Sequence, residues 1–210
     1  MKKAASLWWT VIFSLLTAVS LQADSFKLIT GINLLKYYSL TEENFHWNYK
    51  PSFCFGAGFE FAFNEEETLA VEVDAFLLQK QGSKISEENK NLRFIYHLNS
   101  LCFPALARVK AKERWPFYFL GGGQLFYVLS HKVDIKSGSK VNQVDLKEST
   151  KNFGWALILG GGFETKISKY QKLFIEIRYN LSWLNLLKFP ESGERVTNNS
   201  LLFILGIKNY

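Results

Sequence analysis

The chain has 210 residues, of which 48% are hydrophobic, 16% aromatic and 21% charged, and its formal net charge is +6. This apolar content excludes a disordered chain, and two cysteines are too few for a disulfide scaffold or a cysteine-based zinc site. No run of 18 apolar residues occurs beyond residue 23, which argues against a bundle of membrane-spanning helices.

The beginning of the chain has the pattern of a secretory signal peptide. Two lysines precede an apolar stretch over 7–21, and Ala23 follows as a small residue at the exit. An uncleaved anchor helix is the alternative, but about 15 apolar residues are short for a membrane span. We predict a signal peptide over 1–23 and one domain over 24–210. Its net charge is 23 − 19 = +4, and export makes nucleic acid an improbable partner.

Beyond the signal, apolar residues recur at every second position, which is the period of a β-strand. Eight segments follow this pattern: 26–40, 53–63, 69–77, 101–109, 115–130, 153–167, 173–183 and 201–210. Short turns alternate between them with longer polar loops, which we expect over 41–52, 79–91, 131–152 and 188–200. This organisation is typical of bacterial outer-membrane barrels. The sequence therefore predicts an all-β fold, an eight-stranded antiparallel up-and-down transmembrane β-barrel with short periplasmic turns and long outer loops.

The charges of the four clearest strands all fall in one of the two alternating registers. They are Glu60, Glu72, Asp74, Arg108, Glu176 and Arg178. A charge at the middle of a bilayer costs about 2–4 kcal/mol, so these side chains must point into the lumen. A small barrel has room there for salt bridges and little else, and we expect a charge network that fills it. A path for ions is the alternative.

The other register is apolar and should face lipid. Its predicted lipid-facing residues are Phe53, Phe55, Phe59, Phe61, Phe63, Leu173, Ile175 and Ile177. Aromatic residues towards strand ends are predicted to lie at the membrane interfaces, and these are Trp115, Trp155, Tyr179 and Trp183. The alternative is a soluble periplasmic or secreted lipocalin-like barrel that binds a ligand, with the same phenylalanines in its core. The direction of the side chains over 53–63 distinguishes the two.

Five motifs cover nearly all of the chain beyond the signal. They read FCFGAGFE over 53–60, LCFPALAR over 101–108, PFYFLGGG over 116–123, FGWALILGGGFE over 153–164 and EIRY over 176–179. In this order and spacing they resemble the PorT-like outer-membrane β-barrel family of Gram-negative bacteria, particularly the Bacteroidetes type. The resemblance implies an eight-stranded barrel in the bacterial outer membrane, and it implies no activity, because the family has no defined catalytic residues.

The C-terminal strand departs from what the resemblance implies. Such barrels end in an aromatic residue, with hydrophobic residues at alternating positions before it, and the outer-membrane insertion machinery reads this signal. Tyr210 fits, which makes that machinery an expected partner. Lys208 falls in the same register, however, while Leu205 and Ile207 fall in the other. This predicts a last strand that is bulged or less well recognised.

Candidate sites for phosphate, metal or catalysis are weak. The glycine runs 121–123 and 160–162 lack the Lys-Ser/Thr of a phosphate loop, so we expect them to make room for large lumenal side chains or to permit strong curvature of the strands. No histidine has a second ligand at metal spacing, and we expect no metal or cofactor. His97 and Ser100 are similar to the His-x-Ser-Asn arrangement of lipid A deacylases, but with Ser and Asn exchanged. An enzyme is therefore the less favoured alternative, since a strand directs these two side chains to opposite faces unless a bulge intervenes.

The remaining features point to a role at the cell surface. Cys54 and Cys102 are expected in the lumen. A disulfide between them is the alternative in the oxidising periplasm, but non-adjacent strands are usually farther apart than the roughly 7 Å limit, which favours free thiols. Lysines of the 131–152 loop are placed to contact lipopolysaccharide phosphates, although a solvated loop explains them equally well. We predict a non-enzymatic, monomeric barrel with a structural or surface-interaction role through its long loops, in contact with outer-membrane lipid.

Overall fold

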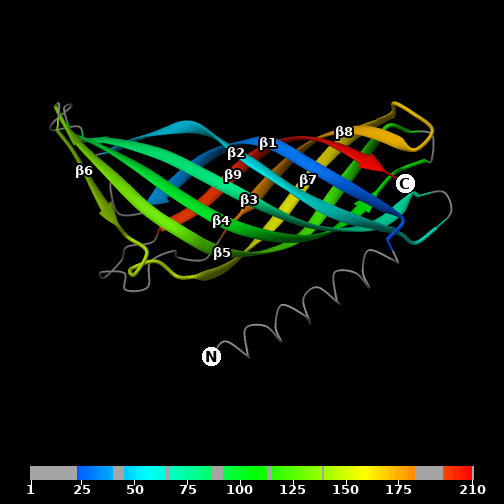
Figure 1. The fold of residues 1–210 in the computed structure, drawn as a ribbon, viewed down its shortest axis with the longest axis horizontal. Coiled ribbons are helices and arrows are strands. Elements are labelled where there is room, and N and C mark those ends of the chain that lie inside the picture. Colours follow the sequence, from blue (N-terminus) through cyan, green and yellow to red (C-terminus); the bar gives the residue numbers. More distant parts are fainter. Residues whose placement is uncertain are drawn as a thin grey trace, which may run out of the picture.

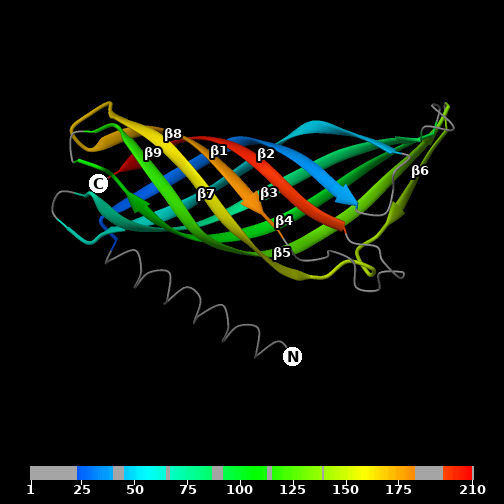
Figure 2. The same cartoon turned by 180° about the vertical axis from the view of Figure 1, so that it is seen from behind.

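The computed structural model describes residues 23–39, 45–64, 67–86, 92–112, 115–138, 140–182 and 196–209. They form nine strands: β1 (Ser25–Ser39), β2 (Phe45–Ala62), β3 (Leu69–Ser86), β4 (Leu92–Val109), β5 (Phe117–Ser137), β6 (Lys140–Asp145), β7 (Phe153–Lys166), β8 (Gln171–Leu181) and β9 (Val196–Asn209). Neighbouring strands are antiparallel, and the pairing of β4 with β5 joins the two halves of the sheet. All strands except β6 therefore close into a barrel (Figures 1 and 2).

The predicted eight-stranded antiparallel barrel is confirmed, but five of its strands are longer than predicted. One of them, β9, begins at Val196, within the predicted loop over 188–200. β3 continues to Ser86 and β4 begins at Leu92, so most of the predicted loop over 79–91 is strand. β2 begins in the predicted loop over 41–52, and β6 forms a hairpin with the end of β5 within the predicted loop over 131–152. These loop predictions were wrong because they relied on alternation between apolar and polar residues. The extra residues lack that alternation and are held in strands by backbone hydrogen bonds to the neighbouring strand.

The outward face of the barrel carries a continuous apolar band. On β4 the band runs from Leu101 to Val109, and a row of polar residues, Gln79, Asn99 and Ser130, lies in register just beyond it. About nine to eleven residues of a tilted strand are needed to cross the hydrocarbon layer, and the band has this height. Phe53 on β2 and Phe63, directly after β2, lie at the two edges of the band and are each 67% exposed. The soluble alternative requires these phenylalanines in a core, which is not where they lie.

The two ends of the barrel differ. At the turn end, short connections join β2 to β3, β4 to β5 and β7 to β8, and the C-terminus lies there as well (Figure 1). At the opposite, loop end, β2, β3, β4 and β5 continue beyond the apolar band, and β6 pairs with β5 to extend the same sheet. We call this sheet the outer wall, and it consists of residues 45–50, 81–86, 92–97, 132–137 and 140–145.

Several predicted features lie outside the described residues. They are the signal peptide up to residue 22, Trp183 and Tyr210. No helix in the described part of the chain is long and apolar enough to cross a membrane.

Candidate functional site: the lumen and the outer wall

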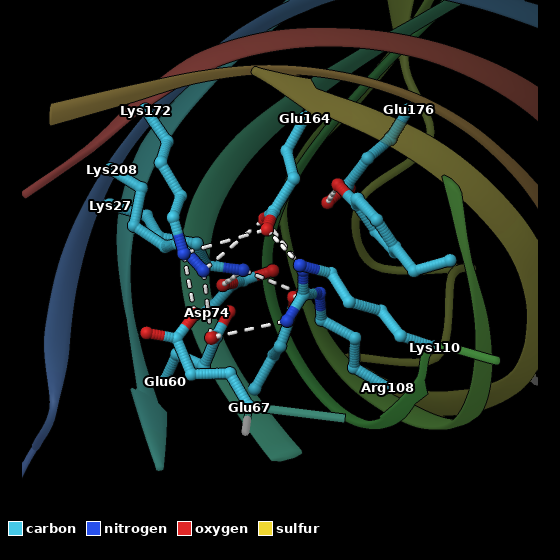
Figure 3. Close-up of polar contacts among 12 residues, drawn as sticks. Lys27, Glu60, Glu67, Asp74, Arg108, Lys110, Glu164, Lys172, Glu176 and Lys208 are labelled. Atoms are coloured by element: carbon cyan, nitrogen blue, oxygen red, sulfur yellow. Dashed lines mark hydrogen bonds and ion pairs between the residues drawn. The ribbon is translucent and has the colours of Figure 1, made fainter. Parts of the chain in front are cut away.

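A single network of charges fills the turn end of the lumen. Its cations are Lys27, Arg108, Lys110, Lys172, Arg178 and Lys208, and its acids are Glu60, Glu67, Glu72, Asp74, Glu164 and Glu176. The side chains come from different strands and converge inside the barrel (Figure 3). Six positive and six negative charges balance, so the network is formally neutral.

Arg178 on β8 anchors one half of the network. Its Nη1 donates to Asp74 Oδ2 at 2.8 Å, and its Nε donates to Glu176 Oε2 at 2.7 Å. Its Nη2 lies 3.5 Å from Glu72 Oε2. Lys27 on β1 shares the same acids, with Nζ 2.6 Å from Glu72 Oε2 and 3.1 Å from Asp74 Oδ1. Since Arg178 is fully buried, these acids replace the water that its guanidinium would otherwise need.

Arg108 on β4 anchors the other half. Its Nη2 donates to Glu164 Oε2 at 2.5 Å, its Nη1 donates to Glu60 Oε1 at 3.3 Å, and its Nε lies 3.6 Å from Glu72 Oε1. Glu72 therefore links Arg108 to Arg178. The guanidinium also lies over the ring of Tyr118, with Cζ 4.3 Å from the ring centroid. Both guanidinium groups thus use most of their donor directions.

Three lysines complete the network near the turn end. Lys208 Nζ donates to Glu60 Oε1 at 2.8 Å and lies 3.3 Å from Glu164 Oε2. Lys110 also donates to Glu164. Lys172 Nζ donates at 2.5 Å to Glu67, an acid from the turn between β2 and β3. Glu67 has a positive φ of 49°, an uncommon conformation for a residue other than glycine.

All six charges predicted from sequence lie in this network, and the other six were missed. The missed residues include Lys27, Glu164 and Lys208, which occupy strands with weaker alternation. A partial signal was present, because each of them directly follows an outward apolar residue, namely Phe26, Phe163 and Ile207. Lys208 is the clearest case: it points inward with 3% of its side chain exposed, and β9 pairs with β1 and β8 without a register shift. The predicted bulge in the last strand is therefore wrong, and the inward lysine is explained by its ion pairs.

The glycine run 160–162 of β7 makes room for this network. A Cβ on Gly162 would lie 2.5 Å from Tyr118 Cζ, and one on Gly160 would lie 2.5 Å from the carbonyl oxygen of Ile177. Tyr118 needs that space because its hydroxyl donates to Glu176 Oε1 at 2.8 Å. The interpretation of this run as space for a large lumenal neighbour is confirmed at Gly162. In the run 121–123 a Cβ on Gly122 would instead meet the backbone of Ala105 and Leu106, so there the expectation was wrong.

Apolar side chains fill the lumen towards the loop end. This apolar layer consists of Ile29, Cys54, Phe76, Leu78, Leu98, Cys102, Phe126, Val128, Phe174, Leu202 and Ile204. On β1, β2, β4, β7 and β9 the charged inward residues lie nearer the turn end than the apolar ones, whereas on β8 Phe174 lies on the turn side of Glu176 and Arg178. Cys54 and Cys102 are both free and buried. Lys80 is also buried at this level, with Nζ 5.8 Å from the centroid of the Phe126 ring.

The predicted outer surface residues point away from the lumen. Phe53, Phe55, Phe63, Ile175 and Ile177 are exposed, each by about half or more. The remaining three predicted lipid-facing residues, Phe59, Phe61 and Leu173, are half-buried. Among the predicted interfacial aromatics, Trp115 is exposed at the turn end, and Trp155 and Tyr179 are exposed towards the loop end.

The structure separates the two residues of the deacylase-like motif. Ser100 is buried and faces the lumen, where its hydroxyl donates to the carbonyl oxygen of Leu78 at 3.5 Å. His97 lies on the outward face, with Nε2 3.1 Å from Asp134 Oδ2. A bulge does occur beside Ser100, but the extra residue is Leu129 of β5, so β4 keeps its alternation.

His131 lies on the inner face of β5, opposite Leu98 and directly before the outer wall. Its Nδ1 is 2.7 Å from Thr150 Oγ1, and burial lowers the pKa of the ring to about 4. The imidazole is therefore neutral at physiological pH. Among the described residues no group of three or more metal-binding side chains occurs.

Comparison with known proteins places these features in context. A family model for an outer membrane protein beta-barrel domain matches residues 23–188. Neisserial surface protein A is similar in structure, with 13% identity over 88% of this chain and 96% of that chain, and a TM-score of 0.44. OprG from Pseudomonas aeruginosa has 11% identity over 90% and 96%, with a TM-score of 0.47. Ail of Yersinia pestis has 12% identity over 88% and 97%, with a TM-score of 0.43. No curated protein matches the chain.

Proposed function

Because the chain belongs to the family of outer membrane protein beta-barrel domains, and so lies in the bacterial outer membrane, we propose that it is a non-conducting, non-enzymatic barrel that acts at the cell surface through its outer wall. The filled lumen carries this proposal. The neutral charge network occupies the turn end, and the apolar layer closes the loop end. An eight-stranded barrel has an interior that side chains alone can fill.

Paired charges argue against an ion path. A conducting pore needs side chains that exchange partners with passing ions and water. Here the central residues Arg108, Arg178 and Glu72 are each about 1% exposed or less, and each contacts several opposite charges. Such a network acts as a plug, and its cross-lumen ion pairs also favour one relative register of the strands.

The outward side chains support contact with lipid. An apolar band flanked by exposed Trp115 at one end and by Trp155 and Tyr179 at the other fits a bilayer with its two interfaces. The same proposal includes a cleaved signal peptide over 1–23, a barrel domain over 24–210, the PorT-like type of this family, and insertion guided by the strand that ends at Tyr210. The separation of His97 from Ser100 supports a role other than catalysis on lipid A.

Planar-bilayer recording tests the plug. The protein is first shown to be folded by its heat-dependent migration on a gel, and is then inserted at matched protein amounts alongside an open porin as a control. We expect no sustained current for this chain, because the charge network and the apolar layer leave no continuous water path. Steady ohmic conductance of the folded protein would contradict the proposal.

The absence of deacylase activity is tested separately. We expect the mass of lipid A to be unchanged in cells that express the protein.

A further inference from the structure

One lysine of the lumen lies outside the charge network. Lys80 on β3 is 3% exposed, and its register neighbour on β4 is the fully buried Leu98. In the part of the chain that the structure describes, no acid forms an ion pair with its ammonium group. The lysines of the charge network, Lys27, Lys110, Lys172 and Lys208, each contact at least one acid. Lys80 therefore differs from them in having no counter-charge.

This lysine gives the lumen an uncompensated charge. The charge network has six cations and six acids and is formally neutral. With Lys80 added, the network and the apolar layer together carry a net charge of 7 − 6 = +1. A buried cation without a counter-charge is costly, because apolar groups replace the water around it. One monovalent anion would restore neutrality.

The immediate surroundings of the ammonium group offer it only weak partners. Lys80 Nζ lies 5.8 Å from the centroid of the Phe126 ring, and the thiol of Cys102 is close enough to interact with its charge. A ring face at this distance attracts a cation weakly, and sulfur is a weak hydrogen-bond acceptor. Since an ammonium group has three hydrogens to donate, most of its hydrogen-bonding capacity is unused.

A second donor lies beside the ammonium group. The Cys102 thiol is 3.7 Å from Ser100 Oγ, and that hydroxyl is 3.5 Å from the carbonyl oxygen of Leu78. Both contacts are long, so neither holds the thiol or the hydroxyl hydrogen firmly in place. The S–H group can therefore turn towards an anion at Lys80 and donate to it together with the ammonium group.

Packing around the lysine restricts the anion to a small one. Leu98, Cys102 and Val128 have no exposed surface, which leaves no room for an acyl chain or a large organic acid. Lys80 keeps a small exposed surface and directly precedes Gln81, the first outer-wall residue of β3, so a small ion can reach it from the loop end. We propose that Lys80 binds one small monovalent anion of the halide class inside the loop end of the lumen.

Urea unfolding of the refolded barrel in neutral detergent tests the site. Sodium bromide replaces sodium gluconate at constant ionic strength, because gluconate is too large for the packed layer. At about ten times the half-saturating bromide concentration, the unfolding equilibrium constant of the parent protein should fall by about tenfold. Lys80→Met and Lys80→Gln should show no such fall, whereas Lys112→Met, at an exposed turn, should respond as the parent does. Fluoride should bind more weakly than bromide, because it loses more hydration on entering an apolar layer.

Crystals grown with sodium bromide locate the ion. We expect an anomalous peak in contact with Lys80 Nζ in the parent protein and no peak there in Lys80→Gln. Gel migration shows whether each variant is folded, and if Lys80→Met does not fold, Lys80→Gln and the parent crystals decide.

Three outcomes would overturn the anion site. They are an equal response of the parent and the Lys80 variants to bromide, crystals of the parent without bromide at Lys80, and stabilisation by decanoate but not by bromide. The last would show that the layer admits an acyl chain. Bilayer current is measured separately, so failure of this site leaves the proposal of a plugged lumen intact.

Discussion

The two layers of the lumen close the same barrel by different physical means. At the turn end, Arg108 and Arg178 are buried among acids from other strands. At the loop end, Leu98 and Phe76 are buried among apolar side chains. Apolar burial stabilises a fold roughly in proportion to the area removed from water. A buried ion pair contributes little net free energy, but removal of one partner leaves the other charge unpaired at high cost.

The comparison separates stability from specificity. The charge network matches each cation to particular acids across the lumen, as Arg178 on β8 is matched to Asp74 on β3, and a shifted register would break several pairs at once. The apolar layer tolerates changes of shape that conserve volume. We infer that the charge network determines the register and order of the strands, and that the apolar layer supplies the greater part of the free energy of folding.

The largest expected effect follows from removal of a central cation. In Arg178→Met, Asp74, Glu72 and Glu176 lose their shared partner inside the barrel. We expect the free energy of unfolding to fall by about 3–5 kcal/mol, because an unpaired buried charge is strongly destabilising. Urea titration of the refolded barrel in detergent measures the change. Lys112→Met, at an exposed turn, is the matched control and should change the value little. If both variants unfold at the same urea concentration as the parent, the charge network is not what holds this end of the lumen.

A somewhat smaller loss is expected from a cavity in the apolar layer. Leu98 is fully buried, and Leu98→Ala should lower the free energy of unfolding by about 3 kcal/mol, within the range found for buried leucines. Leu98→Met conserves volume and should cost less than about 1.5 kcal/mol. The same urea titration distinguishes them. Equal stability of the alanine and methionine variants would show that the layer is loosely packed and that the contrast between the two layers is wrong.

The sequence predicts the barrel well because lipid outside and a filled lumen inside force opposite chemistry onto alternate residues. Residues 53–63 and 69–77 show the alternation, with Glu60, Glu72 and Asp74 between outward apolar residues. The outer wall lacks it. The segment over 140–145, Lys-Val-Asn-Gln-Val-Asp, is exposed along its whole length, so nothing in its pattern separates two faces. Its strand exists because β5 offers backbone partners, and a single sequence carries no direct signal of that pairing.

The sequence predicts which charges point into the lumen, but it does not predict which of them pair. Alternation reveals that Glu72, Asp74 and Arg178 point inward, but the partner of each depends on how strands meet across the lumen. Arg178 and Asp74 are 104 residues apart in sequence. Lys208 illustrates the limit, since its register alone suggested a defect in the last strand, whereas its contacts with Glu60 and Glu164 make it part of the network.

Replacement of a buried cation by methionine should raise the free energy of unfolding in the apolar layer, whereas it lowers it in the charge network. Lys80 is 3% exposed and lies over the ring of Phe126, near the thiol of Cys102. No acid pairs with it among the described residues. A buried cation without a counter-charge is costly, and replacement of buried charges by apolar groups of similar volume is often stabilising. We therefore expect Lys80→Met to raise the free energy of unfolding by about 1 kcal/mol, whereas Arg178→Met lowers it.

Lys80→Gln separates the charge from the shape of the side chain. If desolvation of the ammonium group is the cost, both Lys80→Met and Lys80→Gln remove it, but the amide of glutamine still requires hydrogen-bond partners, so its gain should be smaller. Destabilisation by Lys80→Met would mean that the ammonium group has a favourable partner and that the loop end of the lumen is more polar than its neighbours Leu98 and Phe126 indicate. A stabilising Lys80→Met beside a destabilising Arg178→Met would show that the two layers differ in how each treats a buried positive charge, since both variants remove a cation from the same barrel.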